Sequence, residues 1–312
     1  MSENAKPRKT AGKVADKVPS KAPGKAVATS QKQLEFKLEE WPEKVRAIPN
    51  VFLRSSLFSI SQTRAMSRKL TEITSLEGVE IRFKGEHFNQ DDLDVWEALV
   101  HRARKQPLGT HVRFTVNDIL HELGLDTGGS QHTQFHEKLT RLQGGVIEIR
   151  WPDEGKKLTD KLVGKSFYDE ASETYVLMLS EDLLKIYKTG NTWIDSEACK
   201  LFRRNALARW LYRFYATHAE PFDIKVETLR NLCGSSQTQR LTDFRKALRI
   251  ALKLLVDKEV FLTAEICPRR DVVKVTKVPS SSQRRHLEKK RTQAEALQVN
   301  QNATLFDSPG TE

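Results

Sequence analysis

Ile224-Lys-Val-Glu-Thr-Leu-Arg-Asn-Leu-Cys-Gly234 repeats, 110 positions later, the pattern of Phe114-Thr-Val-Asn-Asp-Ile-Leu-His-Glu-Leu-Gly124. Four positions correspond one for one: Val116, Ile119, Leu123 and Gly124 match Val226, Leu229, Cys233 and Gly234. The three apolar residues of each copy are spaced i, i+3, i+7, which places them on one stripe of a short helix. The glycine after that stripe predicts the end of the helix, because glycine adopts a positive φ at low cost.

Each copy is followed by the same succession of sequence features. A polar stretch leads into a longer amphipathic helix, at 131–143 in the first copy and at 237–257 in the second, and β-rich sequence follows. This order predicts a helix-turn-helix with a β-hairpin wing, present twice. The expected fold is therefore α+β, with two tandem winged-helix domains at residues 61–190 and 191–279.

Apolar periodicity assigns the remaining elements of the two domains. In the first domain we expect a strand at 73–84, helices at 91–105, 116–123 and 181–187, a hairpin starting at 146–151, and strands at 161–168 and 174–179 that close the sheet. In the second domain we expect helices at 196–217 and 226–233 and a wing formed by 260–266 and 272–278.

The two ends of the chain differ from the middle in composition. Residues 1–32 are rich in Lys, Ala, Pro and Ser and predict a disordered basic arm, either a solubilising tail or a loose contact with DNA phosphates. Residues 33–60 combine apolar anchors with prolines and predict an extended lead-in docked on the first domain. Residues 280–312 predict a disordered polar tail with a helical stretch at 283–298.

The charge balance points to an anionic partner. Lys plus Arg total 52 against 41 Asp plus Glu, a formal net charge of +11, which suits DNA or an acidic membrane surface. No apolar run approaches the roughly 18 residues that span a bilayer, and no secretory signal is recognisable, so we expect a cytoplasmic protein with no membrane partner. Cys199, Cys233 and Cys267 lie far apart in sequence and predict neither a disulfide framework nor a zinc site.

The second domain has the stronger candidate DNA-binding residues. In a winged helix the N-terminal end of the second helix enters the major groove, where Gln can pair with adenine and Arg with guanine. The sequence assigns base reading to Gln237, Thr238, Gln239 and Arg240. It assigns phosphate contacts to the outer helix face and the wing, at Thr242, Lys246, Arg249, Lys253, Arg269, Arg270 and Lys274. The alternative is a solvated basic face on a structural helix.

The first domain offers a less positive face. Its candidate DNA-binding residues are Gln131, Thr133, Gln134, Lys138 and Arg141. The alternative is a degenerate winged helix used for protein contacts. We therefore expect the second domain to carry most base recognition, and the first to supply phosphate contacts and a dimer interface.

The sequence predicts no catalytic site. Gly164-Lys165-Ser166 resembles the end of a phosphate-binding P-loop, but residue 159, where that loop needs glycine, is Thr. His121-Glu122 begins like a zinc-protease motif, but residue 125 is Leu. His132 and His136 lack a third ligand nearby and are interpreted as polar groups at a DNA surface. With no His-x-His pair of a strand-nicking initiator either, we expect no enzyme activity, no cofactor and no metal.

Three groups of residues carry a resemblance to a known family, which covers about residues 33–275. They are Trp41-Pro42 with Arg46-Ala47-Ile48-Pro49-Asn50, then Arg54-Ser55-Ser56-Leu57-Phe58, then His218-Ala-Glu-Pro221-Phe222 leading to Leu229-Arg-Asn-Leu-Cys233-Gly234-Ser235. In these residues the chain resembles the TrfA-type replication initiators of broad-host-range bacterial plasmids. The resemblance implies two winged-helix domains that bind direct repeats (iterons) in double-stranded origin DNA and melt an adjacent AT-rich region.

The same resemblance implies a set of partners. They are single-stranded AT-rich DNA, the host sliding clamp, the replicative helicase, the host initiator, and a second copy of the chain in a monomer–dimer equilibrium that restrains copy number. In this family a short Gln-Leu-Ser/Asp-Leu-Phe-like peptide before the Trp-Pro pair contacts the clamp. Here Gln33, Leu34, Phe36 and Leu38 occupy that position, and Leu305 and Phe306 match the final Leu-Phe near the C-terminus. The alternative for both peptides is chance apolar residues in a flexible segment.

Two other functional classes remain open at this point. The first is a winged-helix transcriptional regulator, acting on its own operon, without initiation activity. The second is an enzyme such as a nickase or a helicase-loading ATPase, which the missing P-loop and His-x-His pair disfavour.

Overall fold

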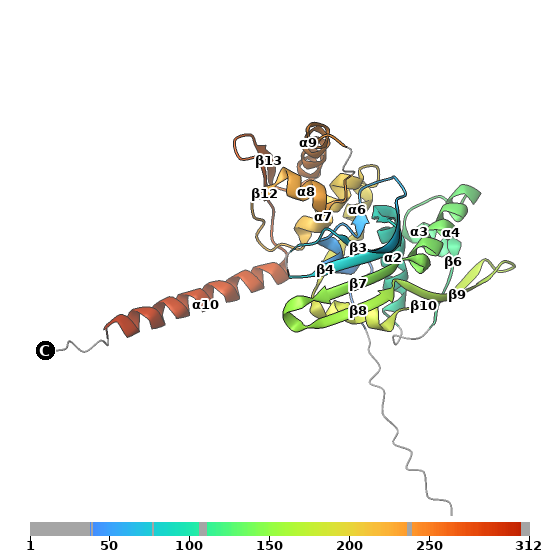
Figure 1. The fold of residues 1–312 in the computed structure, drawn as a ribbon, viewed down its shortest axis with the longest axis horizontal. Coiled ribbons are helices and arrows are strands. Elements are labelled where there is room, and N and C mark those ends of the chain that lie inside the picture. The colour runs from blue at the N-terminus through green and yellow to red at the C-terminus, as the bar shows by residue number, and fades with distance from the viewer. Residues whose placement is uncertain (1–37, 39, 77, 106–110, 236–238, 307–312) are drawn as a thin grey trace, which may run out of the picture. The chain divides into compact units, whose positions relative to one another are not determined.

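The computed structural model describes residues 38, 40–76, 78–105, 111–235 and 239–306, with side chains except at 183–184 and 296–306 (Figure 1). The described elements form a mixed α and β fold with two hydrophobic cores. Trp96 is buried in the first core and Phe214 in the second. No helix among the described residues combines the length and apolar character needed to cross a membrane.

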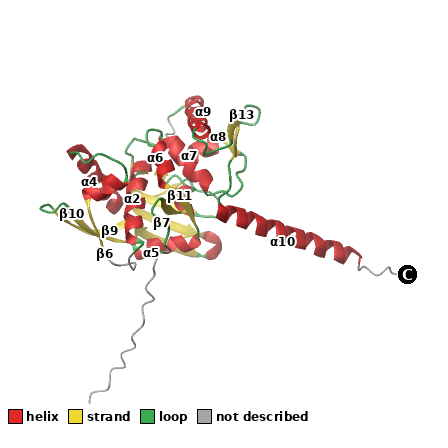
Figure 2. Cartoon of the chain, turned by 180° about the vertical axis from the view of Figure 1, so that it is seen from behind, coloured by secondary structure: helices red, strands yellow, loops and turns green. Residues whose placement is uncertain are grey.

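The repeated sequence pattern is a repeated topology. The first repeat consists of β6 (His111–Thr115), α3 (Val116–Glu122), α4 (Gly129–Gly144), β9 (Val163–Asp169) and β10 (Thr174–Leu179). The second repeat consists of β12 (Ile224–Lys225), α8 (Val226–Leu232), α9 (Leu241–Asp257), β13 (Thr263–Cys267) and β14 (Val272–Thr276). The sheet order is β6-β10-β9 in the first and β12-β14-β13 in the second, antiparallel throughout. In both repeats the strand before the first helix therefore pairs with the last strand of the hairpin. Figure 2 shows β13 beside α8 and α9.

The ends of the two short helices follow from local chemistry. The Thr115 hydroxyl accepts from the backbone N–H of Asp118, and the Asp118 carboxylate accepts from the N–H of Thr115, so α3 starts with a capping box. The two helices end before Gly124, at φ 63°, and Gly234, at φ 65°. The prediction that these glycines take a positive φ is confirmed.

One predicted pairing in the first domain is wrong. The hairpin starting at 146–151 does not share a sheet with the strands at 161–168 and 174–179. It forms a separate four-stranded sheet, visible at the centre of Figure 1, whose order is β3 (Met66–Ile73), β4 (Glu80–Glu86), β7 (Val146–Trp151) and β8 (Lys156–Lys161). Buried Ile147 and Ile149 pair there with Phe83 and Ile81. Alternation of apolar residues marks a strand but does not identify its distant partner, so the sequence could not show this insertion between α4 and β9.

The helix expected at 196–217 is two helices, α6 (Ser196–Leu201) and α7 (Ala206–Ala216). Buried Phe202 lies in the turn between them, and the Asn205 side chain accepts from the N–H of Ala208 as the N-cap of α7. The helix expected at 181–187 is a short α5 (Glu181–Leu184), which is followed by a 3-10 turn, η2 (Lys185–Thr189). A separate 3-10 turn, η1 (Pro152–Glu154), joins β7 to β8.

The lead-in segment pairs with later parts of the chain. Its elements are β1 (Val45–Pro49), α1 (Asn50–Leu53) and β2 (Phe58–Ser59). Strand β1 pairs with β11 (Asn191–Asp195), and β2 pairs with β5 (Phe88–Asn89), which runs directly into α2 (Gln90–Ala103). The lead-in also reaches the second repeat, where the N–H of Ile60 donates to the carbonyl of Cys233 over 2.9 Å.

The C-terminal segment differs from the expected tail. Residues Ser281–Phe306 form one helix, α10, where we expected disorder with a helical stretch at 283–298. Residues 281–295 are exposed or half-buried. Gln, Arg, Lys, Glu, Leu and Ala dominate this stretch and are strong helix formers, so α10 needs little packing to be favoured. The side chain of Gln283 fixes its first turn by donating to the carbonyl of Ala216 over 2.8 Å.

Candidate nucleic-acid interface

Helix α9 presents a polar and basic face to solvent. Its apolar stripe is buried at Phe244, Leu248, Leu252 and Leu255. The four residues expected on the opposite face are all exposed: Thr242, Lys246, Arg249 and Lys253. Ile250, which the sequence analysis missed, lies on the same face with 64 % of its surface exposed. Ile250 lies four residues after Lys246, and this helical spacing could have revealed its position from the sequence. A branched apolar side chain on this face can contact the methyl group of a thymine.

The N-terminal end of α9 is only partly described. Arg240 is the exposed N-cap residue of α9, and half-buried Gln239 accepts from the hydroxyl of Ser235 over 2.5 Å. That hydrogen bond occupies the amide oxygen of Gln239 and leaves its NH2 group for another acceptor. The predicted base-reading residues Gln237 and Thr238 lie outside the described residues.

The cations of the second repeat divide into two groups. Lys253 lies 2.7 Å from Asp257, Lys246 lies 3.5 Å from Asp243, and Arg270 lies 2.8 Å from Asp223. Within the described chain the other predicted cations have no carboxylate within 4 Å: Arg240, Arg249, Arg269 and the half-buried Lys274. The unpaired cations are better placed to contact phosphate, because binding through the others first breaks an ion pair.

A further arginine, missed in the sequence analysis, holds the β13–β14 hairpin against α9. The guanidinium of Arg245 donates to both carboxylate oxygens of Asp271, at 2.9 and 2.6 Å, and this lowers the pKa of Asp271. Asp271 has a positive φ of 50° in the turn of this hairpin, and its carbonyl accepts from the N–H of Val226. Asp271 therefore connects the hairpin, α9 and the start of α8.

The corresponding face of the first repeat is weaker than predicted. Thr133 and Gln134 are exposed, whereas Gln131 and Lys138 are half-buried. Arg141 was expected to bind DNA, but its guanidinium is buried in ion pairs with Asp92 and, at 3.1 Å, with Glu86, so it is not exposed for contact with a phosphate. A helical wheel puts Arg141 near Gln134, but α2 and β4 cover that part of α4, which only the tertiary structure reveals.

The two histidines of α4 have hydrogen-bonding roles within the fold. His132 Nε2 lies 2.8 Å from Asn117 Oδ1, which connects α4 to α3, and His136 Nδ1 lies 2.6 Å from the hydroxyl of Tyr175 in β10. Burial lowers the pKa of His136. Among the described residues no group of three or more His, Cys, Asp or Glu side chains is arranged to hold a metal ion.

The two hairpins carry opposite charges. Asp169 ends β9, and the turn from there to β10 contains Glu170 and Glu173. The turn between β13 and β14 contains Arg269 and Arg270 together with Asp271, whose carboxylate is paired with Arg245. An acidic turn repels phosphate, so the hairpin of the first repeat is unsuited to grip a DNA backbone.

The structure describes the predicted clamp-binding residues to different extents. Leu38 was expected to belong to a clamp-binding peptide, but it is only 4 % exposed and lies in the first hydrophobic core together with Trp41. Gln33, Leu34 and Phe36 lie outside the described residues. Leu305 and Phe306 belong to the backbone of α10, and their side chains are not described.

Comparison with known proteins decides the family. The family model of the TrfA protein matches residues 7–268. The chain belongs to the TrfA family. It is 26 % identical over 249 residues to the plasmid replication initiator protein TrfA of Escherichia coli, a match that covers 75 % of this chain and 65 % of that relative. This TrfA-family chain is therefore matched to about two thirds of the relative's length.

Two solved structures resemble this TrfA-family chain to different degrees. A selenomethionine derivative of domains 2 and 3 of RctB is similar with a TM-score of 0.51 and 12 % identity, over 74 % of this chain and 98 % of that one. A second structure of RctB domains 2 and 3 gives a TM-score of 0.47 and 11 % identity, over 73 % and 96 %. The first similarity shows that the arrangement of helices and sheets recurs at low sequence identity.

Residues in and beside the motifs that carry the family resemblance make contacts within the fold of this TrfA-family chain. Arg54 donates through Nε to the hydroxyl of Thr217 and through Nη2 to its carbonyl, at 2.9 and 2.7 Å. Ser59 lies against Gly234, where a β-carbon added to the glycine would come within 2.5 Å of the serine Cβ. The motifs near residues 54–60 and 218–235 therefore contact each other and join the lead-in to the second repeat.

Proposed function

We propose that this TrfA-family chain is a plasmid replication initiator that binds directly repeated origin DNA through two winged-helix modules. The observation that carries the proposal is the outer face of α9, where Arg249 and the N-cap residue Arg240 are exposed and have no carboxylate within 4 Å among the described residues. In a winged helix this element enters the major groove, and the hairpin beside it contacts the backbone. Arg269, in the hairpin turn, is the unpaired cation placed for that contact.

The two modules have different roles in this proposal. The second repeat reads bases with Gln239 and Arg240 and holds phosphates with Arg249 and the hairpin. The first repeat, with buried Arg141 and an acidic hairpin turn, makes few phosphate contacts and provides the surface for self-association. The protein then opens the adjacent AT-rich DNA and recruits the host helicase, host initiator and sliding clamp, with no catalytic step of its own.

A binding experiment tests the first half of the proposal. Duplexes carrying the direct repeats beside the gene are compared with shuffled duplexes by fluorescence anisotropy at two or more salt concentrations. We expect the repeats to bind about 10³-fold or more tightly than shuffled DNA at physiological salt. Equal affinity for both duplexes would refute repeat recognition.

A second experiment tests initiation and separates it from simple repression. Supercoiled plasmid carrying the origin is treated with permanganate, which oxidises unpaired thymines, with and without the protein. An initiator produces reactive thymines in the AT-rich region, whereas a protein that only occupies the repeats does not. Incubation with divalent metal should leave the plasmid uncut, and strand cleavage would overturn the absence of a catalytic step.

The clamp contact is tested by pull-down with purified sliding clamp. Since Leu38 is buried, we place the contact at the C-terminal Leu305 and Phe306. The double variant Leu305→Ala/Phe306→Ala should lose the clamp, and Phe36→Ala is the comparison at the N-terminal peptide. Retention of the clamp by the double variant would exclude the C-terminal site.

A further inference from the structure

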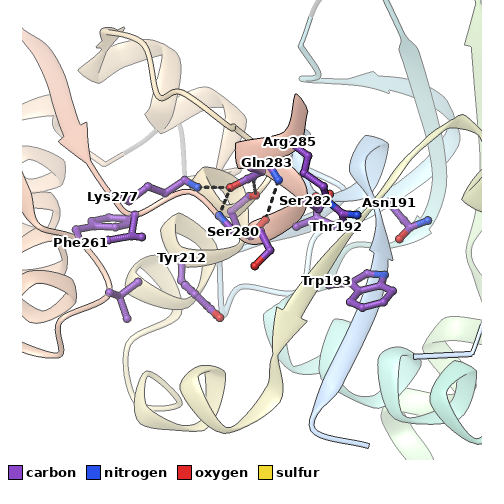
Figure 3. A pocket seen from close by; sticks show the side chains of 14 residues that line it. Asn191, Thr192, Trp193, Tyr212, Phe261, Lys277, Ser280, Ser282, Gln283 and Arg285 are labelled. Atoms are coloured by element: carbon purple, nitrogen blue, oxygen red, sulfur yellow. Dashed lines mark hydrogen bonds between the residues drawn. The ribbon is translucent and has the colours of Figure 1, made fainter. Parts of the chain in front are cut away.

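A pocket of about 750 Å³ lies between β11, α7, the segment before β13 and the first turn of α10 (Figure 3). Its volume falls within the range of small-molecule sites. None of its lining residues is acidic, and two are cationic, Lys277 and Arg285. The pocket is separate from the outer face of α9, since no residue predicted to bind DNA lines it.

One wall of the pocket offers an exposed indole. Trp193, on β11, has 53 % of its surface exposed, whereas Trp41, Trp96 and Trp210 are almost completely buried. The ring stands on the strand beside Thr192 and Asn191, whose side chains also line the pocket (Figure 3). A large flat apolar surface left in contact with water is a stacking site for another planar group.

Another wall holds a cation without a compensating charge. Lys277 is half-buried, and its ammonium donates to the neutral Oε1 of Gln283 over 2.8 Å. Within the described chain no carboxylate lies within ion-pair distance of it, and burial lowers its pKa to about 8. An anion bound here would restore the interactions that the ammonium loses on leaving water.

The first turn of α10 fixes this wall in place. Gln283 donates to the carbonyl of Ala216 in α7 and accepts from the N–H of Ser280, at 2.8 and 3.1 Å. Arg285, two residues further along, is exposed and lines the same pocket. Residues 277–285 lie beyond position 268, where the family match ends.

We propose that this pocket binds an unpaired nucleotide, with its base stacked on Trp193 and its phosphate held by Lys277 and Arg285. The planar ring and the anion of a nucleotide satisfy the indole and the two cations together, and Asn191 and Thr192 line the same pocket. A nucleotide can come from two sources, a free mononucleotide or an unpaired stretch of a DNA strand. The inference does not depend on the binding of duplex repeats.

The experiment uses the full-length protein and two probes. One is a fluorescent thymidine oligomer of about ten nucleotides, followed by anisotropy, a length that suits one stacking groove. The other is ATP, followed by calorimetry. Trp193→Leu and Lys277→Gln should each weaken binding of the recognised probe about tenfold or more. Binding of duplex repeats should change less than about twofold, a factor well below that expected for a lost base stack.

Matched controls separate the pocket from general surface effects. Phe167→Leu removes an exposed aromatic ring on β9, with 67 % of its surface free, and Lys69→Gln removes an exposed lysine on β3. Both should bind the probes as the unaltered protein does. Trp193→Phe, which keeps a smaller ring, should give an intermediate affinity and covers the case in which Trp193→Leu does not fold.

Each outcome has a defined meaning. Loss of oligomer binding in both pocket variants supports the proposal with DNA as the source, and loss of ATP binding supports it with a free nucleotide as the source. If the unaltered protein binds neither probe, or if the pocket variants bind both unchanged, the proposal is wrong. Binding of polyglutamate, but of neither nucleotide probe, would also overturn it and assign the pocket to an acidic peptide.

Discussion

Arg213 of α7 donates through Nη2 to Oδ1 of Asp94 in α2, over 2.6 Å, and so joins the two hydrophobic cores. The same nitrogen lies 2.8 Å from Oε1 of Glu97, whose carboxyl has its pKa raised by burial. Arg209 adds ion pairs to Asp94 and Asp91, both at 2.5 Å. A partly buried ion-pair cluster, with both guanidinium groups buried, thus connects the two cores.

Removing one member of this cluster should be costly. Arg213→Met removes the guanidinium that pairs with Glu97 and leaves Asp94 with Arg209, and we expect the free energy of unfolding to fall by about 3–5 kcal/mol. Urea unfolding followed by circular dichroism measures the change. Arg150→Met breaks a half-exposed pair with Glu80 and should cost less than about 1 kcal/mol. Equal losses in the two variants would contradict a special role for the cluster.

Two glycines with similar φ values should respond differently to alanine. Gly234 has φ 65°, and an added β-carbon would lie 2.5 Å from the Cβ of Ser59, whereas Gly155 has φ 61° and open space around it. Gly155→Ala should therefore cost only the conformational strain, about 1–2 kcal/mol. Gly234→Ala adds overpacking and should cost about 2–5 kcal/mol in total. Thermal unfolding of both variants measures which one loses more stability. A smaller loss of stability in Gly234→Ala than in Gly155→Ala would refute the prediction.

Substitutions of Arg141 and Arg249 should have different effects on the stability of the fold and on the affinity for DNA. Arg141→Gln breaks the buried pair with Asp92 and should lower the melting temperature without a specific effect on DNA affinity in the folded protein. Arg249→Gln removes an exposed cation and should leave stability within about 0.5 kcal/mol of the unaltered protein. If Arg141→Gln folds normally and loses DNA affinity, the structural role assigned here is wrong.

The salt dependence of DNA binding should distinguish residues that contact phosphates from residues that recognise bases. Arg249→Gln should reduce the slope of log K against log salt by about 0.9, because one phosphate contact is lost. Lys253→Gln should reduce it less, since Lys253 already pairs with Asp257. Arg240→Gln should instead relax the preference at one base pair by about 1–3 kcal/mol. Anisotropy titrations at several salt concentrations, with single-base variants of the repeat, measure both effects.

Acid should destabilise the fold through His101. Burial lowers the pKa of this imidazole to about 4, and Trp41 Nε1 donates to its Nδ1 over 2.9 Å, so a proton there would break the hydrogen bond. Between pH of about 6.5 and 4 the unfolded chain binds a proton at His101 that the folded chain does not, and the contribution of His101 to the free energy of unfolding falls by up to about 3 kcal/mol. Glu97, whose pKa burial raises to about 7, contributes in the opposite direction. His218, with a pKa also lowered to about 4 by burial, acts in the same direction as His101.

Unfolding measured across this pH range tests the assignment. His101→Gln should have a shallower fall in the free energy of unfolding than the unaltered protein, and His101→Gln/His218→Gln should be shallower still. Profiles that superimpose on that of the unaltered protein would show that neither imidazole is responsible.

The sequence by itself determined the local elements of both repeats. The apolar stripe of α9, the positive φ at Gly124 and Gly234, and the exposure of Arg249 depend on residues within one or two helical turns. Such features follow from periodicity and backbone sterics, which act over short stretches of chain. They were sufficient to identify the repeat, its order of elements and the face proposed to bind DNA.

Only the tertiary structure decided which distant residues meet. It paired β7 with β4 rather than with the hairpin of the first repeat, buried Arg141 against Asp92, and placed Leu38 in the first core. It also created the pocket beside Trp193 from segments far apart in sequence. A helix face or a strand edge can be covered by many partners, and the choice depends on packing of the whole chain. The helical pattern around Arg141 therefore could not distinguish an exposed DNA contact from a buried ion pair.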